Sequence, residues 1–388
     1  MLCQWGRRLV CRRVGRPPHF VESEPLTVTL ILGIETSCDE TAAAVVADGR
    51  VVRSNVIASQ HELHERYGGV VPEIASRAHL ERIEPVIRTA LDEAGVTLDQ
   101  IDAIAVGNRP GLIGSLVVGV SAAQTLAWSA GKPLIGIDHV QAHLYAPLLT
   151  DAPDHPPSAI RHPPFPALGF VVSGGHTALY AMPAPTTQHL LGKTIDDAVG
   201  EAYDKAAVIL QLGYPGGPAV DRAARDGDPT AYDLPRSLLD RDSLDFSFSG
   251  LKTALLYTVR GRPAGRGKQA RFERSADDLT DPQRCDLAAS FQQAVIDVLI
   301  IKLKRALQRM TDAGDRPAAL LVGGGVSANS LLRRRLLELG EQQGVAVHLP
   351  AMSYCVDNAA MIAGLAFDYH QRGEHATLDL PAIATTAC

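Results

Sequence analysis

Two histidines in the stretch IDHVQAH, His139 and His143, have the spacing of a metal-binding pair. Residues four apart lie on one face of a helix, so both imidazoles can point in the same direction. Two ligands do not complete a metal site, and a histidine pair in a helix is commonly a capping or core feature. The spacing alone therefore leaves the metal hypothesis open.

Glycine-rich turns follow two apolar strands, in VSGGHT (172–177) and GGGVSAN (323–329), and a third turn, YPGGPAVD (214–221), opens a helix. Glycine allows the backbone to approach a ligand closely, and N–H groups at such turns suit phosphate oxygens. Tight turns alone would explain any one cluster, but three around one cleft favour a nucleotide. The chain has neither a G-x-x-x-x-G-K-[ST] motif nor a G-x-G-x-x-G motif in a βαβ setting.

The bulk composition excludes several classes of protein. The chain has 388 residues, 46% of them hydrophobic, and a net charge of −6, which suits two domains and excludes a polycation that binds nucleic acid through bulk charge. The six cysteines form no C-x-x-C pair, so a reducing compartment is expected rather than a disulfide framework. The longest apolar run, 112–130, contains polar residues and is expected to be a buried helix, so we expect no membrane association.

The elements form a pattern that occurs twice, a three-strand meander followed by helix, strand, helix, strand and helix. We expect strands in the first copy at 27–35, 41–49, 50–58, 101–107 and 132–138, and helices at 71–94, 110–130 and from 139. We expect strands in the second copy at 167–175, 176–184, 188–195, 318–325 and 345–350, and helices at 326–343 and 356–371. Such alternation predicts a duplicated α/β fold of two lobes with a central cleft, and ligands bind beyond the carboxyl ends of the strands.

The domain boundaries follow from this pattern. Residues 1–28, rich in arginine, form a leader that we expect to be disordered and exclude from the fold; it resembles a transit peptide or a read-through leader. The lobes are expected at 29–150 and 166–375, joined by a proline-rich linker at 151–165 and followed by a tail at 376–388. A helical insertion is expected at about 195–310, with helices at 198–210, 250–259 and 284–309, and the last helix could pack on the first lobe.

Seven motifs, in order between about Leu32 and Asp368, resemble the TsaD family of tRNA N6-adenosine threonylcarbamoyltransferases. They are GIETSCDET, GGVVPEIASRAHLERI, VSGGHTAL, IDDAVGEAYDKAA, YPGGPAVD, LDFSFSGLKTAL and GGGVSANSLLR. The resemblance implies the actin-like, sugar-kinase-like ATPase (ASKHA) fold, which agrees with the repeat.

The resemblance also implies a set of site residues. It assigns one divalent metal ion, iron(II) in preference to zinc, to His139, His143 and Asp357. It assigns binding of threonylcarbamoyl-adenylate to Val171, Val172, Ser173, Gly174, Gly175, Asp204, Gly217, Asp221 and Asn329. Carboxylates can accept hydrogen bonds from ribose hydroxyls, and glycines let an adenosine lie against the backbone.

The implied reaction is transfer of the threonylcarbamoyl group to N6 of adenosine 37, in tRNAs that read codons beginning with A, with release of AMP. The chain would thus be an acyltransferase. A proton must leave the amine, and Glu40 or, less favoured, Asp39 could accept it; a solvated turn is the alternative. The arginine-rich stretch 259–274 could grip the tRNA backbone or be a solvated loop.

Two residues depart from the family pattern. Gln141 stands between the histidines, where the family often has glutamate, and a glutamine cannot serve as a general base. Arg109 stands where the family usually has glycine, so either the turn differs or the guanidinium serves the ligand.

The resemblance further implies a TsaB-like paralogue and a TsaE-like ATPase as partners, besides tRNA and the adenylate. A bacterial cytoplasm is the expected location, with a mitochondrial matrix as the alternative suggested by the leader. Three rival functions are an ATPase or sugar kinase of the same fold, a zinc peptidase, and a non-catalytic paralogue. The metal residues argue against the first and third, and Gln141 argues against the second.

Overall fold

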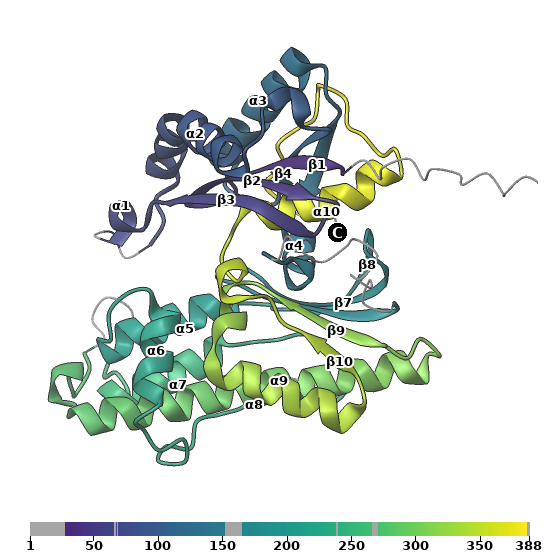
Figure 1. Cartoon of the computed structure of the whole chain (residues 1–388). Helices are drawn as coiled ribbons and strands as arrows, with labels where there is room; N and C mark the ends of the chain where they lie inside the picture. The colour runs from purple at the N-terminus through teal and green to yellow at the C-terminus, as the bar shows by residue number, and fades with distance from the viewer. Residues whose placement is uncertain are drawn as a thin grey trace, which may run out of the picture.

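The computed structural model describes residues 28–385, except 66, 68, 152–164, 238–239 and 266–270. Two lobes, each built on a five-stranded sheet, face each other (Figure 1). The predicted leader, apart from Val28, and nearly all of the predicted linker lie outside the described residues.

The first lobe has the strand order β3-β2-β1-β4-β5. Its strands are β1 (Leu30–Glu35), β2 (Glu40–Ala47), β3 (Val51–Ser59), β4 (Ala103–Arg109) and β5 (Leu134–Asp138). Its helices are α1 (His61–Glu65), α2 (Pro72–Ala94), α3 (Ile113–Ala130) and α4 (His139–His143). β1, β2 and β3 form an antiparallel meander, and β4 and β5 add in parallel.

The second lobe repeats this topology, with the order β10-β9-β6-β7-β8. Its strands are β6 (Ala167–Val172), β7 (Thr177–Ala184), β8 (Thr187–Lys193), β9 (Ala319–Gly323) and β10 (Ala346–His348). Its helices are α5 (Val199–Leu210), α6 (Gly216–Ala224), α7 (Ser249–Arg260), α8 (Asp281–Asp312) and α9 (Ser330–Gln343), and the last helix along the chain is α10 (Ala359–Gln371). The equivalent strand order in both sheets confirms the predicted duplication and the α/β class.

Local sequence explains where the elements begin and end. The β2–β3 turn has positive φ angles at Asp48 (48°) and Gly49 (71°), as a tight turn between antiparallel strands requires. The long helix α8 begins with a capping box in which the Thr280 hydroxyl accepts from the Gln283 N–H and Gln283 bonds back to the Thr280 N–H.

Helices α4 and α10 lie between the two sheets (Figure 1). The glycines beneath them allow close contact: a Cβ on Gly33 of β1 would lie 2.4 Å from the carbonyl oxygen of Ala359, and one on Gly323 of β9 would lie 1.9 Å from that of His143. One continuous apolar core joins β1, α4 and α10 to the inner face of the second sheet. Helices α2 and α3 cover the outer face of the first sheet, and α5 to α9 belong to the core of the second lobe.

Several predicted element bounds differ from the structure. The helix expected from His139 stops at His143 and is followed by a 3₁₀ turn, Ala146–Leu148, because Pro147 lacks the N–H that a continuing helix would use. The helix expected over 326–343 begins at Ser330, after a 3₁₀ turn, and the last helix begins at Ala359 rather than at Val356. Helix α1 was not predicted.

The chain after α10 runs along the first lobe. The Ala376 N–H donates to the Leu134 carbonyl and the Ile383 N–H to that of Asn108, so residues 376–385 follow β5 toward the turn after β4. Within the described residues, α3 alone is long and apolar enough to cross a membrane. It packs against β4 and α2, as a core helix does.

Candidate metal centre and the cleft around it

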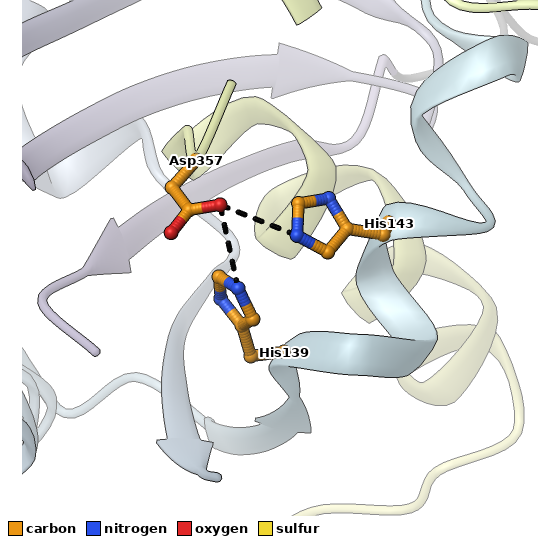
Figure 2. A group of neighbouring side chains, drawn as sticks. All are labelled: His139, His143 and Asp357. Atoms are coloured by element: carbon orange, nitrogen blue, oxygen red, sulfur yellow. Dashed lines mark ion pairs between the residues drawn. The ribbon is translucent and has the colours of Figure 1, made fainter. Parts of the chain in front are cut away.

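His139, His143 and Asp357 come together where the two lobes meet (Figure 2). The two histidines are the first and last residues of α4. Asp138 caps this helix, because its carboxylate accepts hydrogen bonds from the N–H groups of Val140 (2.9 Å) and Gln141 (3.2 Å). This cap sets the direction of the short helix and so the direction of both rings.

Asp357 lies in the loop before α10. The next residue, Asn358, caps that helix by accepting the Met361 N–H, and its amide donates to the Val356 carbonyl at 2.7 Å. These bonds hold the peptide on both sides of Asp357 and turn its carboxylate toward α4, as Figure 2 shows. The Asp357 Oδ1 atom lies 3.5 Å from His139 Nε2 and 3.2 Å from His143 Nε2.

These separations fit three ligands of one ion. Ligand atoms about 2.1 Å from a tetrahedral metal lie about 3.4 Å from one another, close to the two distances observed. His143 is fully buried, and among the described residues neither of its ring nitrogens makes a hydrogen bond of normal geometry. A buried imidazole without such a bond suits a metal ligand, so the chemistry of the donor set fits a divalent ion.

Glu35, at the end of β1, supports His139 from behind. It is fully buried, and its Oε2 lies 2.9 Å from His139 Nδ1, while its Oε1 accepts the Ser37 N–H at 2.5 Å. A Cβ on Gly107 would lie 2.5 Å from the same Oε2, so β4 needs a glycine there. A carboxylate on Nδ1 fixes the proton on that nitrogen and leaves Nε2 to face Asp357.

The charges of the three residues are coupled. Burial alone would lower the pKa of His139, but Glu35 and Asp357 hold it well above the usual value. Burial alone would raise the pKa of Asp357, but His139 and His143 hold it well below its usual range. Coordination requires a neutral imidazole, so metal binding at Nε2 would release a proton.

Two cavities meet at this cluster. The larger has a volume of about 1200 Å³ and the smaller about 690 Å³. They share six lining residues, which are Asp39, Ser173, Gly174, Asp204, Tyr214 and Asp357. Both lobes contribute to each cavity, which confirms the predicted central cleft.

The residues expected to bind the adenylate fall into two groups. Ser173, Gly174, Asp204, Gly217, Asp221 and Asn329 line the smaller cavity, and Gly175 lines the larger one. Val171 and Val172 are fully buried in β6 and line neither cavity, so their side chains serve the core.

Three of the polar side chains in the smaller cavity also shape it. Asp204 accepts the Gly216 N–H at 2.9 Å and so holds the start of α6. Asp221 accepts the Ser330 hydroxyl at 2.8 Å, which ties α6 to α9. Asn329 caps α9 through the Leu332 N–H and donates to Gln292 at 2.7 Å.

The two acids proposed to accept a proton, Asp39 and Glu40, follow β1 on the first lobe. Both line the smaller cavity, and Asp39 also lines the larger one. Burial, followed by the charges of Asp357 and Asp39, raises the pKa of Glu40 to about 9. At this pKa Glu40 is protonated at physiological pH, so it can accept a proton only when positive charge near Asp357 lowers the pKa again.

The two departures from the family pattern have structural explanations. The Gln141 amide donates to the Pro185 carbonyl at 3.3 Å, and its oxygen accepts the Tyr369 hydroxyl at 3.0 Å. It therefore ties the second lobe to α10 instead of acting in the cleft. The Arg109 guanidinium lies 3.6 Å from the Asp138 carboxylate, so it supports the residue that caps α4.

Sequence reasoning missed three residues of the site. Glu35 could have been noticed, because it is an acid at the end of an apolar strand, directly before the TSCDE turn. The other two missed residues are His176 and Tyr214, which line the larger cavity. Burial, with His139 and His143 nearby, lowers the pKa of His176 to about 4, so this ring is neutral at physiological pH.

The contact between Glu35 and His139 predicts the effect of Glu35→Gln on metal binding. The glutamine amide can donate to Nδ1, which favours the tautomer whose Nε2 carries the proton. We expect metal affinity to fall about 10- to 100-fold, measured by titration of the metal-free protein against a chelator. Glu201→Gln, on the rim beside Lys205, should leave the affinity unchanged; equal affinity in Glu35→Gln would refute the role.

Comparison with known proteins places this geometry in a family. The family described as "TsaD: tRNA N6-adenosine threonylcarbamoyltransferase" matches residues 51–364. A protein of that name from Symbiobacterium thermophilum is 50% identical over 359 residues, covering 92% of this chain and 96% of the relative. A relative of the same name from Moorella thermoacetica is 48% identical over 361 residues, covering 93% and 97%.

A structural comparison agrees on the fold. The crystal structure of HypF from T. kodakarensis has a TM-score of 0.55 and 14% identity, over 91% of this chain and 49% of HypF. The sequence relatives extend over nearly the whole chain, including all three residues of the candidate metal centre. The chain therefore belongs to the TsaD family of tRNA N6-adenosine threonylcarbamoyltransferases.

Proposed function

We propose that this protein transfers the threonylcarbamoyl group from threonylcarbamoyl-adenylate to N6 of adenosine 37, in tRNAs that read codons beginning with A, and releases AMP. One observation carries the proposal: a three-residue metal centre lies where two cavities meet, one of them lined by glycine turns and carboxylates. Family membership supports the same reaction.

The smaller cavity is the proposed site of the adenylate. Its volume of about 690 Å³ lies within the range of small-molecule and cofactor sites. Each carboxylate oxygen has two lone pairs. Asp204 and Asp221 can therefore accept hydrogen bonds from ribose hydroxyls while keeping their hydrogen bonds to the Gly216 N–H and the Ser330 hydroxyl. Gly217, which has no atom within 4 Å of a Cβ position, leaves room for the ligand at the start of α6.

The proposed cofactor is one divalent ion held by His139, His143 and Asp357. Two imidazoles and one carboxylate that leave open positions are typical of iron(II), which we favour over zinc. Such an ion acts as a Lewis acid on acyl or phosphate oxygens. Ser173 and Gly174 border both cavities. These residues would therefore orient the threonylcarbamoyl-adenylate against the ion.

The assignment of the reaction is tested by incubating the purified protein and its partners with threonylcarbamoyl-adenylate and unmodified tRNA. Digestion and mass spectrometry should reveal the modified nucleoside. Asp357→Asn, or removal of metal by a chelator, should lower its formation more than about a hundredfold. Asp233→Asn, an exposed acid outside both cavities, should have no effect; absence of product with folded, metal-loaded protein would contradict the proposal.

Glu40 is the proposed acceptor of the amine proton, with Asp39 as the second choice. We expect Glu40→Gln to lower kcat by roughly a hundredfold or more, with metal content and the KM for the adenylate unchanged. The measurement is single-turnover transfer with each variant and with Asp39→Asn. Unchanged turnover in Glu40→Gln would remove Glu40 from the mechanism.

The proposed partners are a TsaB-like paralogue and a TsaE-like ATPase, in a bacterial cytoplasm. An exposed apolar face on α2 and α3 supports a protein partner there: Leu80, Ile113, Val117 and Trp128 are between 48% and 73% exposed. The two helices lie close together at Gly114, where a Cβ would be 2.4 Å from the Ser76 hydroxyl. This face is the proposed docking surface of the TsaB-like subunit.

The docking surface predicts that Val117→Glu weakens association with the TsaB-like subunit at least about tenfold, because a charge would be buried in an apolar contact. Calorimetric titration of the two purified proteins measures this. Leu190→Glu is the matched control, since Leu190 is 47% exposed but lies on β8 of the other lobe. Equal affinities for both variants would place the partner elsewhere.

A further inference from the structure

The two cavities differ in what surrounds them. The smaller one is lined by the glycine turns and carries the carboxylates suited to a nucleotide. The larger one, with a volume of about 1200 Å³, is larger than the adenylate alone requires. Helix α7 forms one of its walls through Lys252, Thr253 and Leu256. A transferase that joins a small donor to a nucleic acid needs one compartment of each kind, both reaching the same reacting atoms.

Helix α7 leads from the larger cavity to a basic segment. Lys252, Leu256 and Arg260 are four residues apart and share one face of the helix. Beyond it, Arg262 and Arg271 are exposed and form no ion pair with any other described residue. Lys252, by contrast, is paired with Asp197 at 2.7 Å. The positive charges that could bind a phosphate backbone are therefore those of Arg262 and Arg271, beyond the end of α7.

An aromatic pair stands at the boundary between the cavities. Tyr214, from the second lobe, lines both of them, and its ring centroid lies 4.7 Å from that of His61, from α1 of the first lobe. The rings are tilted by 44°, and Tyr214 is 37% exposed. Of these two cavities His61 lines only the smaller one, so it contacts Tyr214 on that side, while Tyr214 also borders the larger cavity.

We propose that Tyr214 is the stacking platform for the acceptor adenine, which enters through the larger cavity while the adenylate occupies the smaller one. The inference rests on the proposed function, because it assigns the two substrates of that reaction to the two cavities. An adenine presented by a single-stranded loop must leave its stack, and an aromatic ring replaces the lost contact. From Tyr214 the base borders Asp39, Asp204 and Asp357, which also line both cavities.

A binding cycle tests this without turnover. A synthetic anticodon stem-loop, carrying either adenosine or an abasic site at the target position, is titrated against wild type and Tyr214→Ala by fluorescence anisotropy. We expect Tyr214→Ala to weaken binding of the adenosine RNA about tenfold, and the abasic site to weaken wild-type binding similarly. Combining both changes should cost no more than either alone, since each removes the same contact.

Matched variants separate stacking from other effects. Tyr214→Phe and Tyr214→Trp keep a ring and should bind within about twofold of wild type. Tyr257→Ala is the control, because Tyr257 is also 37% exposed and lies on α7, but lines neither cavity; it should bind normally. In turnover, Tyr214→Ala should raise the KM for tRNA and leave the KM for the adenylate and the metal content unchanged.

Three results would overturn the inference. Independent effects of Tyr214→Ala and the abasic site would show that the ring does not contact the base. An increase in the KM for the adenylate instead of tRNA would place the ring on the donor. Equal binding defects in Tyr257→Ala would show a general surface effect. If Tyr214→Ala fails to fold, Tyr214→Leu, which keeps apolar bulk, gives the same readings. Absence of product with wild type would refute the proposed function, whereas the binding cycle, which requires no turnover, tests the contact between Tyr214 and the base separately.

Discussion

The buried packing of α4 and α10 within the apolar core between the two sheets is the constraint on which the candidate metal centre depends. His139 and His143 are the two ends of α4 and Asp357 lies in the loop before α10, while glycines in β1 and β9 allow the helices to sit against the strands. A side chain at Gly323 would meet the backbone of His143 itself, and backbone cannot move aside cheaply in a close-packed core. The packing of α10 against the first sheet and against α4 therefore sets the distance of Asp357 from His139 and His143.

Electrostatic interactions, in addition to packing, determine the properties of the candidate metal centre. Glu35 lies at the Nδ1 side of His139 and Asp357 at the Nε2 side, so the imidazole lies between two carboxylates. Such an arrangement favours positive charge at the junction of the cavities, which a proton or a bound metal ion would supply. The same junction borders the acids of the first lobe and the glycine turns of the second, so a reaction that develops negative charge on an acyl donor is suited to this place.

Periodicity and turn chemistry in the sequence predict the fold well. The apolar strands and the repeated order of elements correspond to what the structure contains, because strand and helix periodicity are local properties of the chain. The family resemblance, and not the spacing of His139 and His143 alone, was needed to predict Asp357 as a third ligand, and the structure places it beside both rings. What could not be predicted depends on contacts between distant segments: the support of His139 by Glu35, the use of Gln141 as a link between lobes, and the pairing of Tyr214 with His61.

The most direct test of the account is X-ray absorption spectroscopy of the metal-loaded protein, combined with anomalous diffraction to locate the ion. The account predicts one ion at the lobe junction, bound to Nε2 of His139, Nε2 of His143 and a carboxylate oxygen of Asp357, with metal–ligand distances of about 2.0–2.2 Å. An ion bound by groups of a single lobe only, or one lying outside the junction of the two cavities, would contradict it.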